Sequence, residues 1–204
     1  MSEIRVLIVE DEPLIAEDIG EYLTNNDYSV SAIVHNLTDA IEAMQKEQPD
    51  IALLDINLGD NMDGLLIAEE INKSYNFPFL YLTSYTNKSI VDQAKYTRPM
   101  GYIVKPFDEG DLYTSIEIAL YNHSQVNKPR QFNRDLINDK MLNHLTEKEF
   151  EVLNDIYEGR TNKQMSGKHF VSINTIKTHI QKIYDKLDVH SRSEAIAKVR
   201  SLLT

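Results

Sequence analysis

Short apolar runs alternate with longer amphipathic segments over the first 123 residues. The apolar runs cover residues 4–9, 30–34, 51–54, 77–82 and 102–104. Segments with helical spacing of apolar positions lie between and after them, at 13–25, 38–47, 64–75, 88–98 and 109–122. Uniformly apolar strands that alternate with helices are typical of a parallel sheet covered on both faces. We therefore expect an α/β fold, a doubly wound sheet of five parallel strands.

A different pattern begins near residue 145. Three Ser or Thr residues are each followed three positions later by Glu or Gln, as in capping boxes that mark helix starts: Thr146 with Glu149, Thr161 with Gln164, and Ser191 with Glu194. Ser172 is a good N-cap for a fourth helix. We expect residues 145–204 to form a small four-helix domain. Residues 124–144 are mostly polar and form the expected linker, with one short helix around Leu136 and Ile137.

Composition narrows the class of protein. The 204 residues are 42% hydrophobic and 26% charged, as in ordinary globular proteins, and they include no cysteine, which excludes disulfides and thiol chemistry. The N-terminus is unlike a signal peptide and no apolar run approaches membrane-spanning length, so we expect a cytoplasmic protein without membrane contact. Residues 1–125 hold 7 basic and 22 acidic side chains, whereas residues 145–204 hold 10 and 8. This asymmetry favours cation binding in the first part and nucleic-acid contact in the second.

Polar side chains follow four of the five predicted strands. Glu10 and Asp11 end the first, Asp55 the third, Thr83 the fourth and Lys105 the fifth. The carboxyl ends of strands in such a sheet meet at one edge, so these side chains should converge. Clustered carboxylates suit Mg²⁺, and a carboxylate can attack a phosphoryl group whose charge the metal and a lysine neutralise. A single acid at a strand end is often only a solvated loop residue, but five suitable residues together favour a site.

The stretches VLIVEDE (6–12), LLDINLGDNMDG (53–64), YLTSYT (81–86) and GYIVKPF (101–107) resemble the receiver domain of two-component response regulators over residues 3–123. The resemblance implies a flavodoxin-like fold, with Asp55 as phosphoacceptor and a cis bond between Lys105 and Pro106. It implies Mg²⁺ ligands from Glu10, Asp11, Asp55 and the backbone carbonyl of Asn57, and a switch set of Thr83, Tyr102 and Lys105. The loop after Asp55 is one residue longer than the common receiver pattern and lacks its proline.

An apolar stripe marks the third helix of the C-terminal domain, at Ile173, Ile176, Ile180, Ile183 and Leu187. LTEKEFEVL (145–153), EGRTNKQMS (158–166), VSINTIKTHIQKIYDKLDV (171–189) and SRSEAI (191–196) resemble the LuxR/NarL-type helix-turn-helix. The resemblance implies a recognition helix from Ser172 to Leu187. Its expected DNA-facing residues are Thr175, Lys177, Thr178, Gln181 and Lys182. His169 stands where this family usually packs leucine, so we expect a packed neighbour and neither a metal ligand nor a sensor.

Together these features predict a response regulator that is not an enzyme beyond its own phosphorylation and dephosphorylation. A sensor histidine kinase would phosphorylate Asp55, and the protein would bind promoter DNA, as a homodimer once phosphorylated. One alternative is an Mg²⁺-dependent aspartyl-phosphate phosphohydrolase of the haloacid dehalogenase type, but that class needs an acid two residues after the nucleophile, where this chain has Asn57. Another is an effector domain that acts through a protein partner, since its net charge is only +2.

Overall fold

The computed structural model describes residues 4–59, 61–75, 77–84, 88–127 and 132–203. These residues form two compact units, one of Ile4–Ala119 and one that begins at Leu120. No helix in the described ranges is long and apolar enough to cross a membrane.

The first unit is built on the expected parallel sheet. Its strands are β1 (Arg5–Val9), β2 (Ser29–Val34), β3 (Ile51–Asp55), β4 (Phe79–Thr83) and β5 (Gly101–Val104), in the order β2-β1-β3-β4-β5. Every neighbouring pair is parallel. β3 and β4 are buried along their whole length, which explains why their sequences show no alternation of apolar and polar residues. The flavodoxin-like fold is confirmed.

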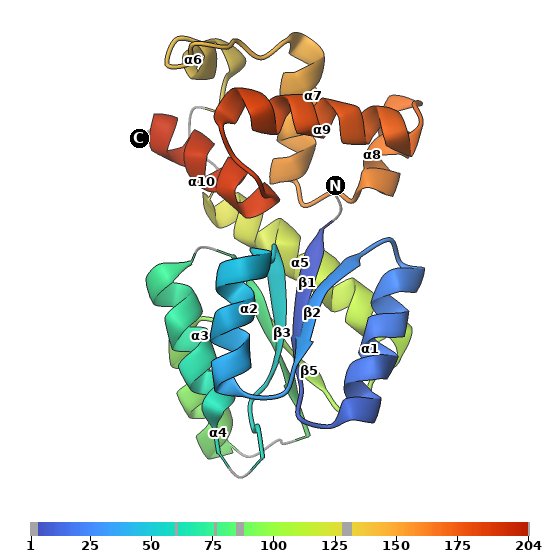
Figure 1. Cartoon of the computed structure of the whole chain (residues 1–204), viewed down its shortest axis with the longest axis vertical. Helices are drawn as coiled ribbons and strands as arrows, with labels where there is room; N and C mark the ends of the chain where they lie inside the picture. Colours follow the sequence, from blue (N-terminus) through green and yellow to red (C-terminus); the bar gives the residue numbers. More distant parts are fainter. Residues whose placement is uncertain (1–3, 60, 76, 85–87, 128–131, 204) are drawn as a thin grey trace. The chain divides into compact units, whose positions relative to one another are not determined.

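Helices cover both faces of this sheet (Figure 1). They are α1 (Pro13–Asn25), α2 (Leu37–Glu47), α3 (Asp63–Ser74), α4 (Lys88–Ala94) and α5 (Glu109–Asn127). The single helix expected at 88–98 is α4 followed by a 3-10 turn, η1 (Lys95–Thr97), where the Thr97 hydroxyl donates to the Ala94 carbonyl at 2.7 Å. Arg98 then ends the segment with a φ of 56°. α5 continues five residues beyond its expected end at residue 122.

The second unit contains α6 (Arg134–Asn138), α7 (Glu147–Tyr157), α8 (Asn162–His169), α9 (Ile173–Leu187) and α10 (Arg192–Leu203). The first two expected capping boxes are complete, and Ser172 caps α9. At the third, Ser191 Oγ accepts from the Glu194 N–H, but the Glu194 carboxylate accepts from the His190 N–H. The apolar stripe on α9 is buried from Ile176 onward, whereas Ile173 is 38% exposed.

Part of the expected linker is packed into this unit. Ile137 of α6 is fully buried in the core that α7, α9 and α10 share. Phe132 stacks on Phe150 with ring centroids 5.2 Å apart. In the last turns of α5, His123 and Ser124 are also buried. The polar composition of 124–144 therefore hides a few apolar residues that extend the core of the helical domain.

Candidate functional site

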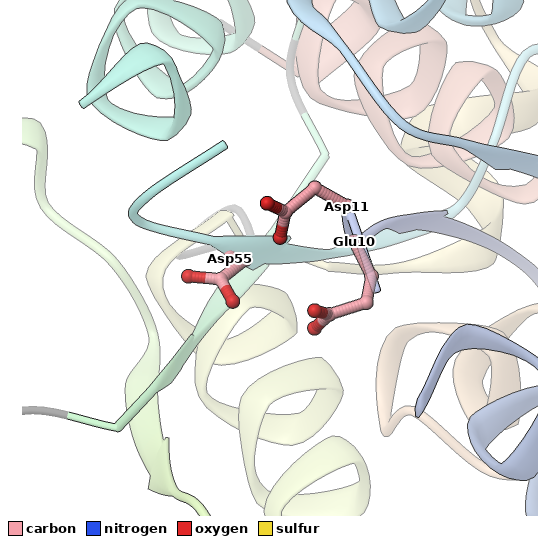
Figure 2. Close-up of side chains that lie close together, drawn as sticks. All are labelled: Glu10, Asp11 and Asp55. Atoms are coloured by element: carbon pink, nitrogen blue, oxygen red, sulfur yellow. The ribbon is translucent and has the colours of Figure 1, made fainter. Parts of the chain in front are cut away.

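Three carboxylates meet at the carboxyl end of the sheet. Glu10 and Asp11 follow β1 directly and Asp55 is the last residue of β3, so parallel pairing of these neighbouring strands brings them together. One oxygen from each lies within 4.8 Å of the others (Figure 2). Glu10 is fully buried, Asp55 is 7% exposed and Asp11 is half-buried. The convergence expected from the strand ends is therefore present.

Lys105 supplies a positive charge at this cluster. Its Nζ lies 2.6 Å from Asp55 Oδ2 and 2.6 Å from Glu10 Oε2, and the bond to Pro106 is cis, as expected. Burial alone would lower the pKa of Lys105, but its hydrogen bonds and attraction to both carboxylates outweigh burial and raise that pKa. Burial raises the pKa of Glu10 despite the opposing ion pair. The ammonium therefore stays charged and bridges the two acids.

Backbone N–H groups hold the remaining carboxylate oxygens. Gly59 donates to Asp11 Oδ2 at 2.8 Å, and Asn57 donates to Asp55 Oδ1 at 2.9 Å. Three carboxylates facing one ammonium leave two negative charges in excess. Hard oxygen ligands with that excess fit a divalent cation such as Mg²⁺. The donor set thus suits the metal that the resemblance implies, and the Asn57 backbone lies beside it.

The approach of α3 to β3 depends on Gly64, whose role the sequence did not indicate. A Cβ at this position would lie 2.0 Å from the Asp55 carbonyl oxygen and 2.8 Å from the Ile56 Cα. The Gly64 N–H donates to the Ile56 carbonyl at 3.2 Å. Before it, Leu58 and Asn61 exchange backbone hydrogen bonds that close the loop after Asp55. The start of α3 can therefore sit directly against the residue that carries the Asp55 carboxylate.

A second residue missed in the sequence is His35, which follows β2. Its Nδ1 lies 2.6 Å from the Glu10 backbone carbonyl, and since a carbonyl only accepts, the ring nitrogen donates. The Glu10 N–H donates to the Val34 carbonyl at 3.1 Å. Both backbone groups of Glu10 are thus fixed by the end of β2. Only the three-dimensional pairing of β1 with β2 reveals this, because 25 positions separate His35 from Glu10.

The expected switch residues lie on β4, on β5 and directly after β5. Thr83 is the last residue of β4 and is 4% exposed, and its carbonyl accepts from the Lys105 N–H at 2.8 Å. Tyr102 pairs with Tyr81 across the strands, with ring centroids 5.7 Å apart. Burial raises the pKa of Tyr102, whose hydroxyl is enclosed by protein atoms. Thr83 and Lys105 thus lie at the carboxyl ends of two paired strands, and Tyr102 lies further back along β5.

The polar face of α9 is the second candidate site. Thr175, Thr178, Gln181 and Lys182 are exposed, and Lys177 is half-buried. The Thr178 hydroxyl donates to the Asn174 carbonyl at 2.9 Å, and the Gln181 amide donates to Asp185 at 2.8 Å. The buried face of α9 is fixed to α7 by Lys186, which lies 2.6 Å from Glu149. The helix therefore offers hydroxyl, amide and ammonium groups outward from a firm support.

Residues 6–117 match the response regulator receiver domain, and residues 143–199 match the LuxR family of bacterial regulatory proteins. The response regulator protein VraR of Staphylococcus saprophyticus is 32% identical over 199 residues, which cover 95% of this chain and 94% of VraR. The transcriptional regulatory protein YdfI of Bacillus subtilis is 28% identical over 210 residues, covering 98% of each chain.

Solved receiver domains are similar to the first unit. The signal receiver domain of a modulated diguanylate cyclase from Desulfovibrio desulfuricans matches with a TM-score of 0.57 and 32% identity, covering 61% of this chain and 99% of that domain. A CheY-like receiver domain protein from Methanospirillum hungatei matches with a TM-score of 0.56 and 25% identity over 61% and 99%. The chain belongs to the two-component response regulators, and it joins a receiver domain to a LuxR-type helix-turn-helix as a transcriptional regulator.

Proposed function

We propose that Asp55 accepts a phosphoryl group from a sensor histidine kinase and that this modification controls the binding of α9 to promoter DNA. The observation that carries the proposal is the convergence of Asp55, Glu10 and Lys105 within 2.6 Å contacts at the carboxyl end of the sheet. The kinase and DNA are the partners typical of the family. Because its proposed phosphoryl donor is a kinase and its proposed target is DNA, we propose that the protein acts in the cytoplasm.

In the proposed reaction, a carboxylate oxygen of Asp55 attacks the phosphorus of a phosphohistidine. The new O–P bond forms as the P–N bond breaks, and the imidazole leaves. Glu10, Asp11, Asp55 and the Asn57 carbonyl would hold Mg²⁺, which would neutralise charge on the transferring group. Lys105 already contacts Asp55 Oδ2, so its ammonium is in position to bind the phosphoryl oxygens.

The added phosphoryl group gives Thr83 and Tyr102 their roles. Three new acceptor oxygens at Asp55 attract the Thr83 hydroxyl from the adjacent strand, and Tyr102 moves with it. The surface around α4 and β5 changes as a result. We propose that this surface change promotes a homodimer, which presents two α9 helices to DNA through Thr175, Lys177, Thr178, Gln181 and Lys182.

Catalysis is limited in this proposal to the formation and hydrolysis of the protein's own aspartyl phosphate. The phosphohydrolase alternative is weakened by the position two residues after Asp55, where Asn57 holds the nucleophile with its backbone N–H and offers no second acid. A protein-binding effector domain is less favoured than a DNA-binding one, because the polar face of α9 carries the groups that contact base edges and phosphates.

The test is phosphorylation by a small-molecule donor with Mg²⁺. Wild-type protein should gain an acid-stable, base-labile phosphoryl group, and its affinity for duplex DNA and its association state should rise together in a titration followed by sedimentation. Asp55→Asn should gain neither label nor affinity. Equal labelling of Asp55→Asn would refute the phosphoacceptor. Full labelling of wild-type protein without any change in DNA affinity would refute the coupling.

A further inference from the structure

A polar cluster lies inside the helix-turn-helix unit, between α7 and α8. We propose that His169 is a positioning residue for the DNA-binding surface, and that its ring connects α8 to α7 through both of its nitrogens only in the neutral form. The inference goes beyond phosphorylation control, and it rests on the DNA-binding function proposed above. It makes DNA binding sensitive to acid, so His169 would be a sensor as well as the packed neighbour expected from the sequence.

The centre of the cluster is a buried pair of side chains. Asp155 on α7 is fully buried, and the side chain of His169, the last residue of α8, is 6% exposed. Their Oδ2 and Nε2 atoms lie 2.5 Å apart. Val152, Ile156 and Met165 from the same two helices are buried in the apolar core. A carboxylate removed from water among such residues is stable only with close partners. The pair therefore fixes α8 to α7.

The charge of Asp155 is compensated without a positive histidine. Lys168 lies 2.5 Å from Asp155 Oδ1, and Arg160 lies 3.3 Å from the same oxygen. From α10, Arg192 donates to the backbone carbonyl of Asp155 at 3.4 Å. Two cations thus already face one carboxylate. His169 can serve as a neutral hydrogen-bond donor there.

The partner of the other ring nitrogen indicates the protonation state and tautomer of His169. Lys148 Nζ lies 2.9 Å from His169 Nδ1. An ammonium group has hydrogens to donate and no lone pair to accept with, so Nδ1 must be the acceptor and carry no hydrogen. The ring hydrogen is then on Nε2, where it is donated to Asp155. The arrangement fits the neutral ring in a single tautomer.

A second ring proton would compete with Lys148 for Nδ1. It would face the ammonium directly, and an alternative acceptor, Glu151 Oε2, lies 3.7 Å from Nδ1. That oxygen is already 2.8 Å from Lys148. Protonation therefore displaces Lys148 from the ring, so the contact between α7 and α8 keeps the bond from Nε2 to Asp155 and loses the one at Nδ1. Only residues 170–172 separate α8 from α9, so the change reaches the support of the recognition helix.

His169→Gln provides a matched comparison. A glutamine amide retains an N–H donor for Asp155 and an oxygen acceptor for Lys148, but it gains no proton in this pH range. The five other histidines are the same in both proteins, so their titration cancels in the ratio of affinities. The probe is a duplex that the full-length wild-type protein selects from a random library at about pH 8. Affinity for it is then measured from about pH 8 to about pH 5.5, the range in which histidine titrates.

Near pH 8 we expect wild-type protein and His169→Gln to bind the duplex with equal affinity. Between about pH 8 and about pH 5.5 we expect the affinity of wild-type protein to fall about fivefold more than that of His169→Gln. A constant ratio across the range overturns the proposal. Nitrogen NMR of the wild-type ring gives a test that needs no variant: the Nε2–H tautomer near pH 8 supports the cluster, and the Nδ1–H tautomer or a charged ring overturns it. If no duplex is selected near pH 8, the DNA-binding function fails, while the NMR result still decides the protonation of His169.

Discussion

Gly64→Ala tests whether the position of Asp55 depends on the close backbone contact between α3 and the end of β3. The added Cβ would lie 2.0 Å from the Asp55 carbonyl oxygen and within 2.9 Å of two Ile56 backbone atoms. Real Cβ contacts are more than about 1 Å longer than the first of these, and none of the three atoms belongs to a flexible side chain. Either α3 or the end of β3 must therefore move by about 1 Å. Such a shift costs about 1–3 kcal/mol of stability, and misplacement of a reacting group by this amount slows a reaction by about 100-fold.

The assay is the rate of phosphorylation by a small-molecule donor at saturating Mg²⁺, with urea unfolding measured alongside. Gly20→Ala is the matched control, because its Cβ would meet Ile33 Cδ1 at an ordinary 3.5 Å inside a helix of the same unit. That variant should be as stable as wild type or slightly more so, and should be phosphorylated at the wild-type rate. If Gly64→Ala keeps the wild-type rate and stability, the contact of α3 with β3 does not position Asp55.

Three further predictions concern the metal, the second unit and DNA. Asp11→Ala should weaken Mg²⁺ binding in a titration, since it removes one of three converging carboxylates, and unchanged affinity would exclude Asp11 as a ligand. Burial, aided by the positive Arg200, lowers the pKa of His123 from 6.5 to about 4. Between pH 6.5 and pH 4 the unfolded chain therefore binds a proton at His123 and the folded chain does not. The free energy of unfolding of the second unit should fall as the pH is lowered through this range, and it should fall by about 3 kcal/mol more in wild-type protein than in His123→Gln. Urea unfolding followed on α9 amide signals measures this, and parallel pH profiles would contradict it. Lys182→Ala should reduce the salt slope of DNA binding by about 1, and an unchanged slope would remove Lys182 from the phosphate contacts.

The sequence predicted the fold well where local patterns are strong. Uniformly apolar runs located all five strands to within two residues, and the pairs Thr146–Glu149 and Thr161–Gln164 located two helix starts. Prediction was weaker where tertiary contacts decide. The polar segment around Phe132 and Ile137 packs into the second unit through a few apolar side chains, which composition averages conceal.

The convergence of the candidate site residues was predictable as far as it depends on strand ends. Strand order makes the residues after β1, β3, β4 and β5 converge, and hard oxygen ligands suggest the metal. Gly64 and His35 could not be found this way, because their roles depend on backbone atoms that the sequence does not place. Asp155 was missed for a similar reason. An acid in a helix gives no sign of burial until its partners His169 and Lys168 are known to face it.

The charge distribution constrains how phosphorylation can act on DNA binding. Residues 1–125 carry a net charge of −15, and phosphorylation of Asp55 makes this segment still more negative. DNA is itself a polyanion, so electrostatics alone would lower affinity when the receiver is phosphorylated. A gain in affinity therefore has to come from a change in shape or in association state, such as pairing of two receivers. The two causes differ in their salt dependence. A change in shape that moves the acidic receiver away from DNA relieves repulsion, and this gain in affinity disappears as ions screen the charges. A dimer instead doubles the number of phosphate contacts, which makes affinity fall more steeply with salt.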